Sequence, residues 1–443
     1  MKESLYNIYF TTPDGTELVF NSFSRGLASV DGRYKKLLSM LPNIKETSLP
    51  KSLKEVLGAA EQGHFLISDD YNEIEEYLTK QRTQRYATDA LGLTIAPTLN
   101  CNFKCIYCYE TSKPGIMDEA TQKNLIEFVR KQSKRLNSLN VTWYGGEPLL
   151  AHSIINALSK KMIAICKEES VEYHAYIITN GYLLNNEIIE MLKMNKVDGA
   201  QVTIDGPKRV HDARRVNKSG KSSFDRIIEN INKLIKNKIN VSIRINTDKT
   251  NEKNIEELIS FLEKNLISKK VAITFGQVTA STSVCRAIES SCFNNITFAK
   301  RLKKYYAILH KYGFEELNPY PYPTTKFNYC CADLLNSFVT DPEGYLYKCW
   351  NDVGVISESV GNINDPTLDI FSWKNGQKIK HLDPIPSKCS KCAVLPICAG
   401  GCSHNGNKRS KAVCGLERYS IIDTMKIYYE ASLKNKSNGK EIK

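Results

Sequence analysis

Between residues 91 and 278 the chain alternates short apolar runs with longer amphipathic segments. Six apolar runs of strand length are predicted as β-strands: 91–98, 139–144, 173–179, 199–204, 239–246 and 270–278. Five segments with apolar residues at helical spacing lie between them: 118–136, 153–168, 185–194, 223–236 and 254–264. Because strands that alternate with helices form parallel sheets, the pattern predicts an α/β fold with helices outside a parallel sheet. Six strands are fewer than the eight that close an α/β barrel.

The first 88 residues contain no cysteine and show a mixed pattern. Strands are predicted at 6–10 and 17–20 around the turn residues 13–15, at 26–30, and at 65–67. Helical periodicity follows at 32–41, 52–61 and 71–84, and again much later at 298–312. The segment is therefore expected to form a small α+β module.

The predicted strand 239–246 places one polar face inside the sheet. Ser242, Arg244 and Asn246 alternate there with apolar residues, on a strand expected to be buried. A buried guanidinium requires an anionic partner, which could be a bound carboxylate or a carboxylate of a neighbouring helix.

The composition indicates a cytoplasmic metalloprotein of two or three domains. The 443 residues are 42% hydrophobic, yet no apolar run is long enough to cross a bilayer. The first residues also lack the apolar core of a signal peptide. Fourteen cysteines in such a chain indicate metal ligation rather than disulfides.

The net charge of +13 does not by itself identify a partner. Lysines are spread along helical stretches such as 300–311, which is typical of a solvated face, and no basic stripe is interleaved with aromatic residues. We therefore expect neither a nucleic acid nor a membrane as partner.

Three cysteines follow the first predicted strand of the α/β region. Cys101, Cys105 and Cys108 have the spacing C-x3-C-x2-C, with Tyr107 directly before the last thiol. Three thiolates can hold a four-iron cluster and leave one iron open, as a catalytic metal site requires. Half of a zinc site would use the same residues.

This arrangement resembles the signature of the radical S-adenosylmethionine (SAM) superfamily, in which SAM chelates the open iron. The resemblance implies a partial, laterally open barrel and reductive cleavage of SAM to a 5′-deoxyadenosyl radical. It continues in Gly145-Gly146-Glu147-Pro148 at the end of the second strand, which is similar to the motif that binds the SAM ammonium group. It also implies cofactor contacts from Tyr107, Asn180, Asp205 and Arg244, the last with the SAM carboxylate. Without it, residues 145–148, Asn180 and Asp205 would be read as turn residues.

A second set of cysteines lies near the C-terminus and resembles the SPASM extension of radical SAM enzymes. Its members are Cys330, Cys349, Cys389, Cys392, Cys398, Cys402 and Cys414. Two four-cysteine zinc sites are the alternative. By resemblance, a distal auxiliary cluster is held by the residues at 389, 392, 398 and 414, and a nearer one by those at 330, 349 and 402. The fourth ligand of the nearer cluster is expected to be Cys331, Cys292, Cys285 or a substrate thiolate.

The resemblance extends over nearly the whole chain and implies four segments. These are a winged-helix-like peptide-recognition module at 1–88, a partial (β/α)6 SAM barrel at 89–290, a helical bridge at 291–329, and a loop-rich SPASM iron–sulfur domain at 330–443. The module either binds a leader peptide as an added strand or only caps the barrel.

The expected function is that of a peptide maturase with SAM and three 4Fe–4S clusters. It crosslinks a ribosomally made precursor peptide carrying a leader segment, preferably through a Cys thioether, and takes electrons from a flavodoxin or ferredoxin. Carbon–carbon crosslinking fits almost as well. A sulfatase-maturase-like oxidase is disfavoured because Trp350 stands where those enzymes have an Asp, with Asp352 as the nearest acid. A non-catalytic multi-zinc adaptor is the remaining alternative, and no residue is assigned as catalytic base.

Overall fold

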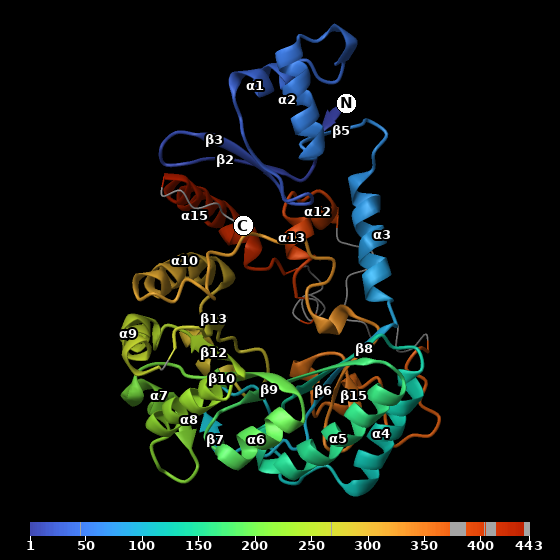
Figure 1. Ribbon diagram of the computed structural model, residues 1–443, viewed down its shortest axis with the longest axis vertical. Helices are drawn as coiled ribbons and strands as arrows, with labels where there is room; N and C mark the ends of the chain where they lie inside the picture. The colour runs from blue at the N-terminus through green and yellow to red at the C-terminus, as the bar shows by residue number, and fades with distance from the viewer. Residues whose placement is uncertain (45, 267, 373–386, 403, 405–412, 438–443) are drawn as a thin grey trace. The chain divides into compact units, whose positions relative to one another are not determined.

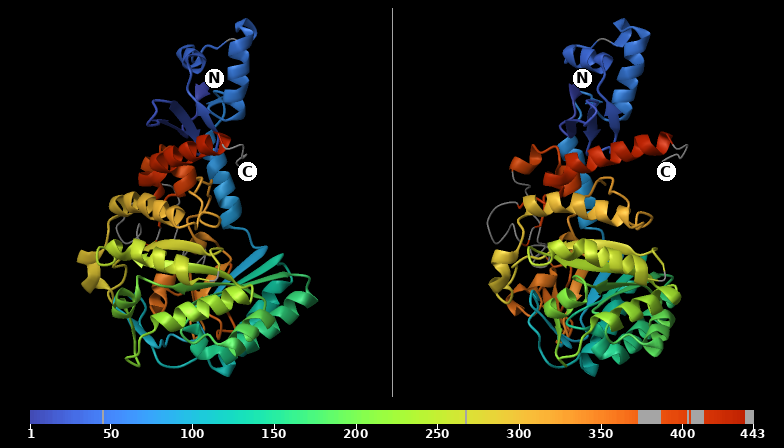
Figure 2. Two further views of the ribbon diagram at one scale, coloured as in Figure 1. Left: turned by 60° about the vertical axis from the view of Figure 1, so that its left-hand side comes forward. Right: turned by 90° about the vertical axis from the view of Figure 1, so that its left-hand side faces the viewer.

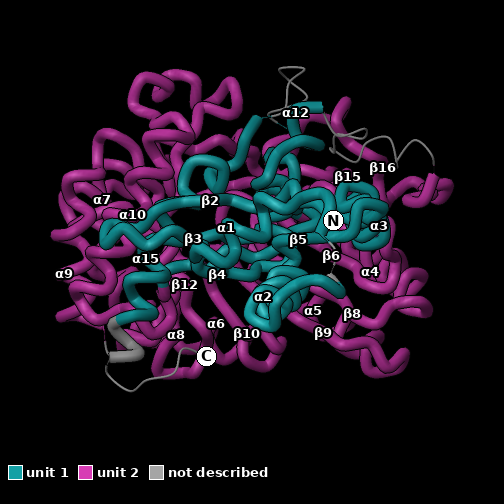
Figure 3. Tube along the Cα trace, turned by 90° about the horizontal axis from the view of Figure 1, so that it is seen from above, with its two compact units in different colours: residues 1–85, 320–330, 381–443 teal, residues 86–319, 331–380 magenta. Residues whose placement is uncertain are grey.

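The computed structural model describes residues 1–44, 46–266, 268–372, 387–402, 404 and 413–437. The chain forms two compact units, coloured separately in Figure 3. Unit 1 contains residues 1–85, 320–330 and 381–443, and unit 2 contains residues 86–319 and 331–380. The change of unit after Arg85 lies close to the expected boundary at 88, whereas the expected segment 330–443 is divided between the two units.

Unit 2 is built on a nine-stranded sheet that contains all six predicted strands (Figure 1). These are β6 (Ala90–Ile95), β8 (Ser138–Trp143), β9 (Glu172–Thr179), β10 (Val197–Thr203), β12 (Asn240–Thr247) and β13 (Ala272–Gln277). They lie in this order, and every neighbouring pair is parallel. The prediction of a six-stranded parallel sheet is therefore confirmed.

The predicted helices connect these strands. They are α4 (Glu119–Ser133), α5 (His152–Glu168), α6 (Asn186–Met194), α8 (Phe224–Lys236) and α9 (Ile255–Asn265), and α10 (Asn295–Lys311) follows β13. Three of these helices start at side-chain caps: Asp118 accepts from the Thr121 amide, Asn185 from the Ile188 amide and Asn294 from the Thr297 amide. Because parallel crossovers are right-handed, a sheet wound in one direction carries its helices on one face.

The segment Pro148–Glu168, which includes α5, is long and apolar enough to cross a membrane by length and composition. Half of its most apolar stretch is buried inside the protein, and α5 packs on α4 and β9. This burial is what a core helix of an α/β fold shows.

The end of the chain extends the same sheet. β14 (Ser337–Thr340) pairs parallel with β6, and β15 (Tyr345–Tyr347) and β16 (Gly361–Asn362) follow antiparallel. The strand pattern of the sequence did not predict these short elements. They place the residue after β15, Lys348, inside unit 2.

Lys348 is buried and holds this extension together. Its Nζ donates to three backbone carbonyl oxygens, those of Leu334, Leu335 (3.0 Å) and Ser337 (2.6 Å). The ammonium also lies over the ring of Phe338, 4.4 Å from its centroid. A buried ammonium with three carbonyl acceptors ties the end of β15 to the start of β14.

Replacing Lys348 by Met should loosen this part of the sheet, because three buried carbonyls lose their donor. We expect a local loss of about 3 kcal/mol, or roughly a 100-fold faster amide exchange. Hydrogen–deuterium exchange of peptides that cover β14 and β15 measures it. Lys160→Met, on the exposed side of α5, is the control, and equal exchange in both variants would contradict this role for Lys348.

Unit 1 contains the elements predicted for the first 88 residues. Strands β2 (Asn7–Thr11), β3 (Glu17–Asn21) and β4 (Leu27–Ser29) form an antiparallel sheet, while β1 (Lys2–Glu3) pairs with β5 (Leu66–Ile67). The helices are α1 (Gly32–Ser39), α2 (Lys51–Gln62) and α3 (Glu73–Arg85). Prediction and structure agree here to within about two residues at each end.

The small sheet of unit 1 is buried on both faces. Val19 packs against Leu53 and Leu57 of α2, whereas its neighbours Leu18 and Phe20 point to the opposite side. There they share a core with residues of α13 (Leu395–Cys398) and α15 (Glu417–Ser437), the long helix at the red end of the colour scale in Figure 2. The N-terminal module and the cysteine-rich C-terminal region are therefore one folded body, although nearly 300 residues separate them in the sequence.

Candidate functional site

The three-cysteine loop of unit 2 is held by a small sheet of its own. β7 (Phe103–Cys105) pairs antiparallel with β11 (Arg215–Asn217), and Cys105 lies directly opposite Arg215. β11 follows the short helix α7 (Lys208–Arg214), which the sequence pattern did not reveal. This pairing brings an arginine from residue 215 to the cysteine loop.

All three thiols of the loop have raised pKa values because the protein buries them. Burial raises the pKa of Cys101 to about 12 and that of Cys108 to about 11, and it raises the pKa of Cys105 as well. The charge of Cys105 also raises the pKa values of Cys101 and Cys108. They are therefore protonated at neutral pH without a metal, and metal binding would release their protons.

Gly145 and Gly146 allow two strand ends to touch through their backbones. A Cβ on Gly146 would lie 2.3 Å from the Asn100 carbonyl oxygen, and one on Gly145 would lie 2.4 Å from that of Thr98. Gly145 also has a φ of +110°. The amides of Gly146 and Glu147 donate to the Thr98 and Asn100 oxygens (3.2 and 2.9 Å). The two glycines thus fix the backbone that leads into Cys101.

Glu147 is completely buried and ties β8 to β9. One carboxylate oxygen accepts from the Thr179 hydroxyl (2.7 Å) and the Leu149 amide (3.1 Å), and the other from the Asn180 amide (2.7 Å). Burial raises the Glu147 pKa, and these donors oppose that rise. The carboxylate thereby fixes the position of Asn180, and its contact with the SAM ammonium group stays a prediction.

Asn180 continues this network to the cysteine loop. The side-chain nitrogen of Asn180 donates to the side-chain oxygen of Asn102 (2.7 Å), and the side-chain oxygen of Asn180 accepts from the Tyr182 backbone amide (2.9 Å). The predicted residues Gly145, Gly146 and Asn180 therefore all contact the segment from Thr98 to Asn102 that carries the first thiol.

A second network surrounds Tyr107, between the second and third thiols. Its hydroxyl donates to the buried carboxylate of Asp205 and accepts from Arg215 (2.7 Å) and Asn246 (3.3 Å). The other Asp205 oxygen accepts from the Asn246 amide (3.0 Å). The predicted residues Tyr107 and Asp205 are thus hydrogen-bonded to each other.

Arg215 brings a positive charge into this network through its hydrogen bond to Tyr107, and sequence reasoning did not find it. Burial lowers the pKa of Arg215, but the charges of Cys105, Tyr107 and Asp205 outweigh burial and hold it well above its usual range. Its Nε is buried and has no acceptor among the described residues. The available signal was the pair of adjacent arginines in the unassigned segment after the fourth strand.

The predicted Arg244 lies elsewhere on the polar face of β12. Its Nε donates to the Asn246 side chain (3.1 Å), and its guanidinium covers Gly276, where a Cβ would lie 2.2 Å from Nη2. Ser242, Arg244 and Asn246 are half-exposed, while Ile243 and Ile245 are fully buried. The expected polar face is confirmed, and burial lowers the pKa of the half-buried Arg244 on it.

An aromatic group follows the third thiol. The hydroxyls of Tyr109 and Tyr144 hydrogen-bond to each other, and Tyr144 packs on Trp350 with ring centroids 4.5 Å apart. Burial raises the Glu110 pKa to about 7, and the Tyr144 hydroxyl opposes that rise through a hydrogen bond. Trp350 therefore presents an aromatic surface at the position where the alternative oxidase class would need a carboxylate.

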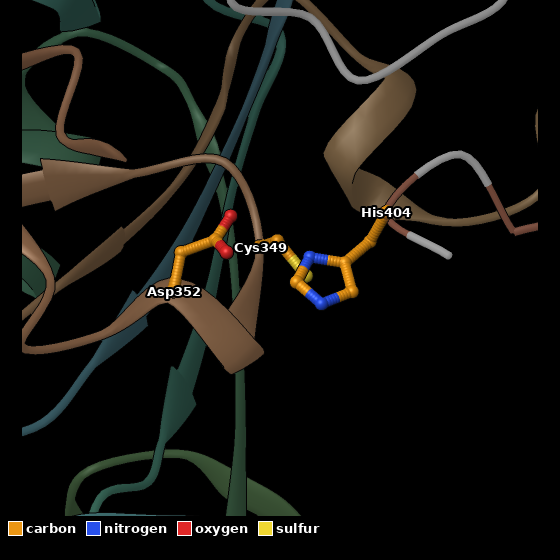
Figure 4. A group of neighbouring side chains, drawn as sticks. All are labelled: Cys349, Asp352 and His404. Carbon is orange, nitrogen blue, oxygen red and sulfur yellow. The ribbon is translucent and has the colours of Figure 1, made fainter. Parts of the chain in front are cut away.

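The remaining cysteines of unit 2 have different surroundings. Cys349 and the buried Asp352 have ligand atoms within 4.8 Å of each other at the end of β15; Figure 4 shows these two side chains with His404, a residue of unit 1. The Cys285 thiol is buried against the Thr279 and Thr282 carbonyls, and that of Cys292 donates to the Ile288 carbonyl. Cys331 begins a single helical turn.

Unit 1 contains the four cysteines predicted to hold the distal cluster. The charges of Cys392 and Cys414 act on Cys389, and that of Cys414 acts on Cys398. Burial raises the pKa of Cys398 to about 11, while the amides of Gly415 and Gly400 donate to its sulfur. Four thiols with amide donors around one sulfur fit a fully ligated cluster. Cys330 and Cys402 also belong to unit 1, whereas Cys349 belongs to unit 2.

A protein-family model and known proteins match parts of this sequence. A protein-family model described as the radical SAM superfamily matches residues 95–262, which include the three thiols, the glycine pair and Asp205. The cysteine-type anaerobic sulfatase-maturating enzyme of Clostridium novyi (strain NT) is 24% identical over 78% of this chain and 96% of its own length.

Two solved structures share the fold. Native anSMEcpe with bound AdoMet and the Kp18Cys peptide is 20% identical and covers 79% of this chain and 98% of its own, with a TM-score of 0.61. Streptococcus suis SuiB bound to the precursor peptide SuiA is 16% identical and covers 93% and 97%, with a TM-score of 0.54. Together with the six parallel strands, these matches confirm the predicted partial α/β barrel.

Proposed function

Because this chain belongs to the radical SAM superfamily, through its domain at residues 95–262, we propose that it is a peptide maturase that forms a Cys thioether crosslink in a ribosomally made precursor peptide. It is an enzyme related to sulfatase maturases. This relationship, with the fold that the chain shares with SuiB, favours a peptide maturase over a non-catalytic zinc adaptor. The observation that carries the proposal is the Cys105–Tyr107–Asp205–Arg215 network, which builds a preorganised cation beside an open three-thiol site.

Each part of the site has a role in this proposal. When bound, a cluster on Cys101, Cys105 and Cys108 together with SAM supplies a 5′-deoxyadenosyl radical, and auxiliary clusters accept the electron left over when the crosslink closes. Glu147 and Asn180 hold the strand ends around the cysteine loop. The unpartnered Nε of Arg215, or the half-buried guanidinium of Arg244, would hold the SAM carboxylate.

The peptide substrate is supported by unit 1 and by the neighbours. Among the described residues, β2 and β4 are the edge strands of the three-stranded sheet, so each has one edge open to an added strand. The structures of anSMEcpe and SuiB hold peptides, Kp18Cys and SuiA respectively. We expect a leader segment to bind along such an edge.

Thioether formation is favoured over oxidation of Cys or Ser by the residue at position 350. Trp350 packs on Tyr144 with tilted rings, so position 350 offers no carboxylate to act as the base of the oxidase class. In the proposed reaction one carbon–hydrogen and one sulfur–hydrogen bond break and one carbon–sulfur bond forms. The hydrogen atom leaves on 5′-deoxyadenosine, the thiol proton goes to solvent, and an auxiliary iron–sulfur cluster would accept the remaining electron.

The test is a reaction of the reconstituted enzyme, under anaerobic conditions with dithionite and SAM, on the short cysteine-containing peptide encoded beside its gene. We expect the product to lose about 2 mass units and to resist alkylation at Cys, because the thiol is consumed. A carbonyl-reactive product, formed from Cys with loss of its sulfur or from Ser with loss of two hydrogens only, would instead identify a sulfatase-maturase-like oxidase. A mass loss with a free thiol would identify carbon–carbon crosslinking.

The proposal also specifies the number of iron–sulfur clusters and the electron donor. Three 4Fe–4S clusters require ten protein thiols at the positions given above, and the electron donor is a flavodoxin or ferredoxin of the cytoplasm. Iron analysis at about 12 per chain supports three clusters, whereas about 4 would limit the enzyme to the SAM cluster.

A further inference from the structure

Tyr6 carries a hydroxyl that the described part of the chain leaves without a hydrogen-bond partner. Its side chain is completely buried, and the oxygen has no exposed surface. Buried polar groups in native proteins nearly always have partners, since an unmade hydrogen bond costs folding free energy. The hydroxyl therefore indicates an acceptor that is present when the protein is complete.

The position of the Tyr6 ring is well determined within unit 1. The Tyr6 amide donates to the Ser4 hydroxyl (3.1 Å), and the Tyr6 carbonyl accepts from the Ser22 amide (3.0 Å). The ring packs in one core with Tyr77 and Leu395, and its centroid is 5.6 Å from that of Phe23. The thiols of Cys389 and Cys392 pack against the same core.

Three groups lie close enough for their charges to act on the Tyr6 hydroxyl, and two of them are engaged in other hydrogen bonds. After burial, which is the largest cause, the charges of Glu73, Tyr71 and Cys392 raise the Tyr6 pKa. The Glu73 oxygens accept from the Ser4 hydroxyl (2.5 Å) and the Leu5 amide (2.8 Å). The Tyr71 hydroxyl donates to Glu76. Cys392 packs against the Tyr6 core, and its sulfur can accept a further hydrogen bond beside the one from Arg418.

We propose that the Tyr6 hydroxyl donates a hydrogen bond to the Cys392 sulfur when that sulfur is a cluster ligand, so that the N-terminal module tunes the distal auxiliary cluster. The inference rests on the proposed function, which places this cluster on Cys389, Cys392, Cys398 and Cys414. Tyr6 acts through the ligand and is a positioning residue. A second donor reaches the same sulfur, since Arg418 Nη1 of α15 lies 3.7 Å from Cys392 Sγ.

The expected consequence concerns the reduction potential of the distal cluster. Reduction adds negative charge to the cluster and its thiolates, and a hydrogen bond to a ligand sulfur stabilises that charge. Loss of the Tyr6 hydroxyl should therefore make reduction harder. A roughly tenfold change in the one-electron equilibrium constant, or about 59 mV towards lower potential, is the expected size.

The experiment compares Tyr6→Phe with a matched control in the same core. Tyr77→Phe removes a hydroxyl that donates to the Lys326 carbonyl (3.0 Å), so it repeats the chemical change without touching the sulfur. Potentiometric titration of the full-length, cluster-loaded protein, followed by electron paramagnetic resonance, gives each potential. A lowered potential in Tyr6→Phe alone supports the inference, whereas equal potentials in all three proteins overturn it.

A second measurement uses the wild-type protein and is independent of how the variant folds. Electron–nuclear double resonance of the reduced distal cluster should detect an exchangeable proton that is lost in deuterium oxide and absent in Tyr6→Phe. Its absence in the wild type overturns the inference. If iron analysis of the wild type finds no distal cluster, the proposed function fails in that part and the inference fails with it. A loaded cluster without the proton refutes the inference alone.

Discussion

Replacing Cys101, Cys105 and Cys108 together by Ala should abolish formation of 5′-deoxyadenosine, a loss of at least about 1,000-fold. In the proposed function these three thiols ligate the cluster and leave one iron open for SAM. Chromatography and mass spectrometry of the reaction with dithionite and SAM measure the product. Iron should fall by about 4 per chain at the same time.

Cys166→Ala is the matched control for this variant. Cys166 is a buried thiol of α5 within the core of unit 2, so its loss removes a sulfur without touching the site. Iron content and SAM cleavage should stay at the wild-type level. Cleavage that persists in the triple variant would refute the assignment of the SAM cluster to this loop.

Gly146→Ala should have the next largest effect, about 100-fold on SAM cleavage. Its Cβ would lie 2.3 Å from the Asn100 carbonyl oxygen and 2.7 Å from that of Leu99, and both are backbone atoms that cannot rotate away. The strand ends must separate, which breaks the hydrogen bond from the Gly146 amide to Thr98 and shifts the backbone before Cys101. Overpacking of this kind costs about 1–3 kcal/mol, and about 100-fold in rate corresponds to its upper end.

Two readouts separate this effect from general destabilisation. Titration of the reconstituted enzyme with SAM should show weaker binding, and the rate of 5′-deoxyadenosine formation should fall with it. Gly58→Ala is the control, because a Cβ there meets no atom within 4 Å and the glycine lies inside helix α2. Wild-type affinity and rate in Gly146→Ala would show that the close approach is not required.

Local pattern was enough to predict the barrel. Each of the six parallel strands and its helix is defined by a run of residues with its own periodicity, as in β12, where Val241, Ile243 and Ile245 alternate with polar residues. The caps Asp118 and Asn185 also act on amides only three residues away. Such signals depend only on neighbouring residues, so they can be recognised from the sequence alone.

The same reasoning could not predict which strands pair with each other. β14 has four residues and pairs with β6, which lies more than 240 residues earlier, and β7 pairs with β11 across more than 100 residues. A short strand buries its side chains wherever a free edge exists, so its periodicity does not identify its neighbour. For this reason Arg215 was missed, whereas Arg244 was singled out because it lies on a regular strand.

The sequence alone determined the parallel α/β fold, the three thiols of the cysteine loop and the glycine pair at the end of the second strand, because spacing and periodicity are local properties. Only the tertiary structure decided what those residues contact. It showed that Glu147 connects two strand ends by hydrogen bonds, that Arg215 lies opposite Cys105, and that Tyr6 shares a core with Cys392. These contacts depend on which distant segments meet on folding, and that choice is made by packing of the whole chain.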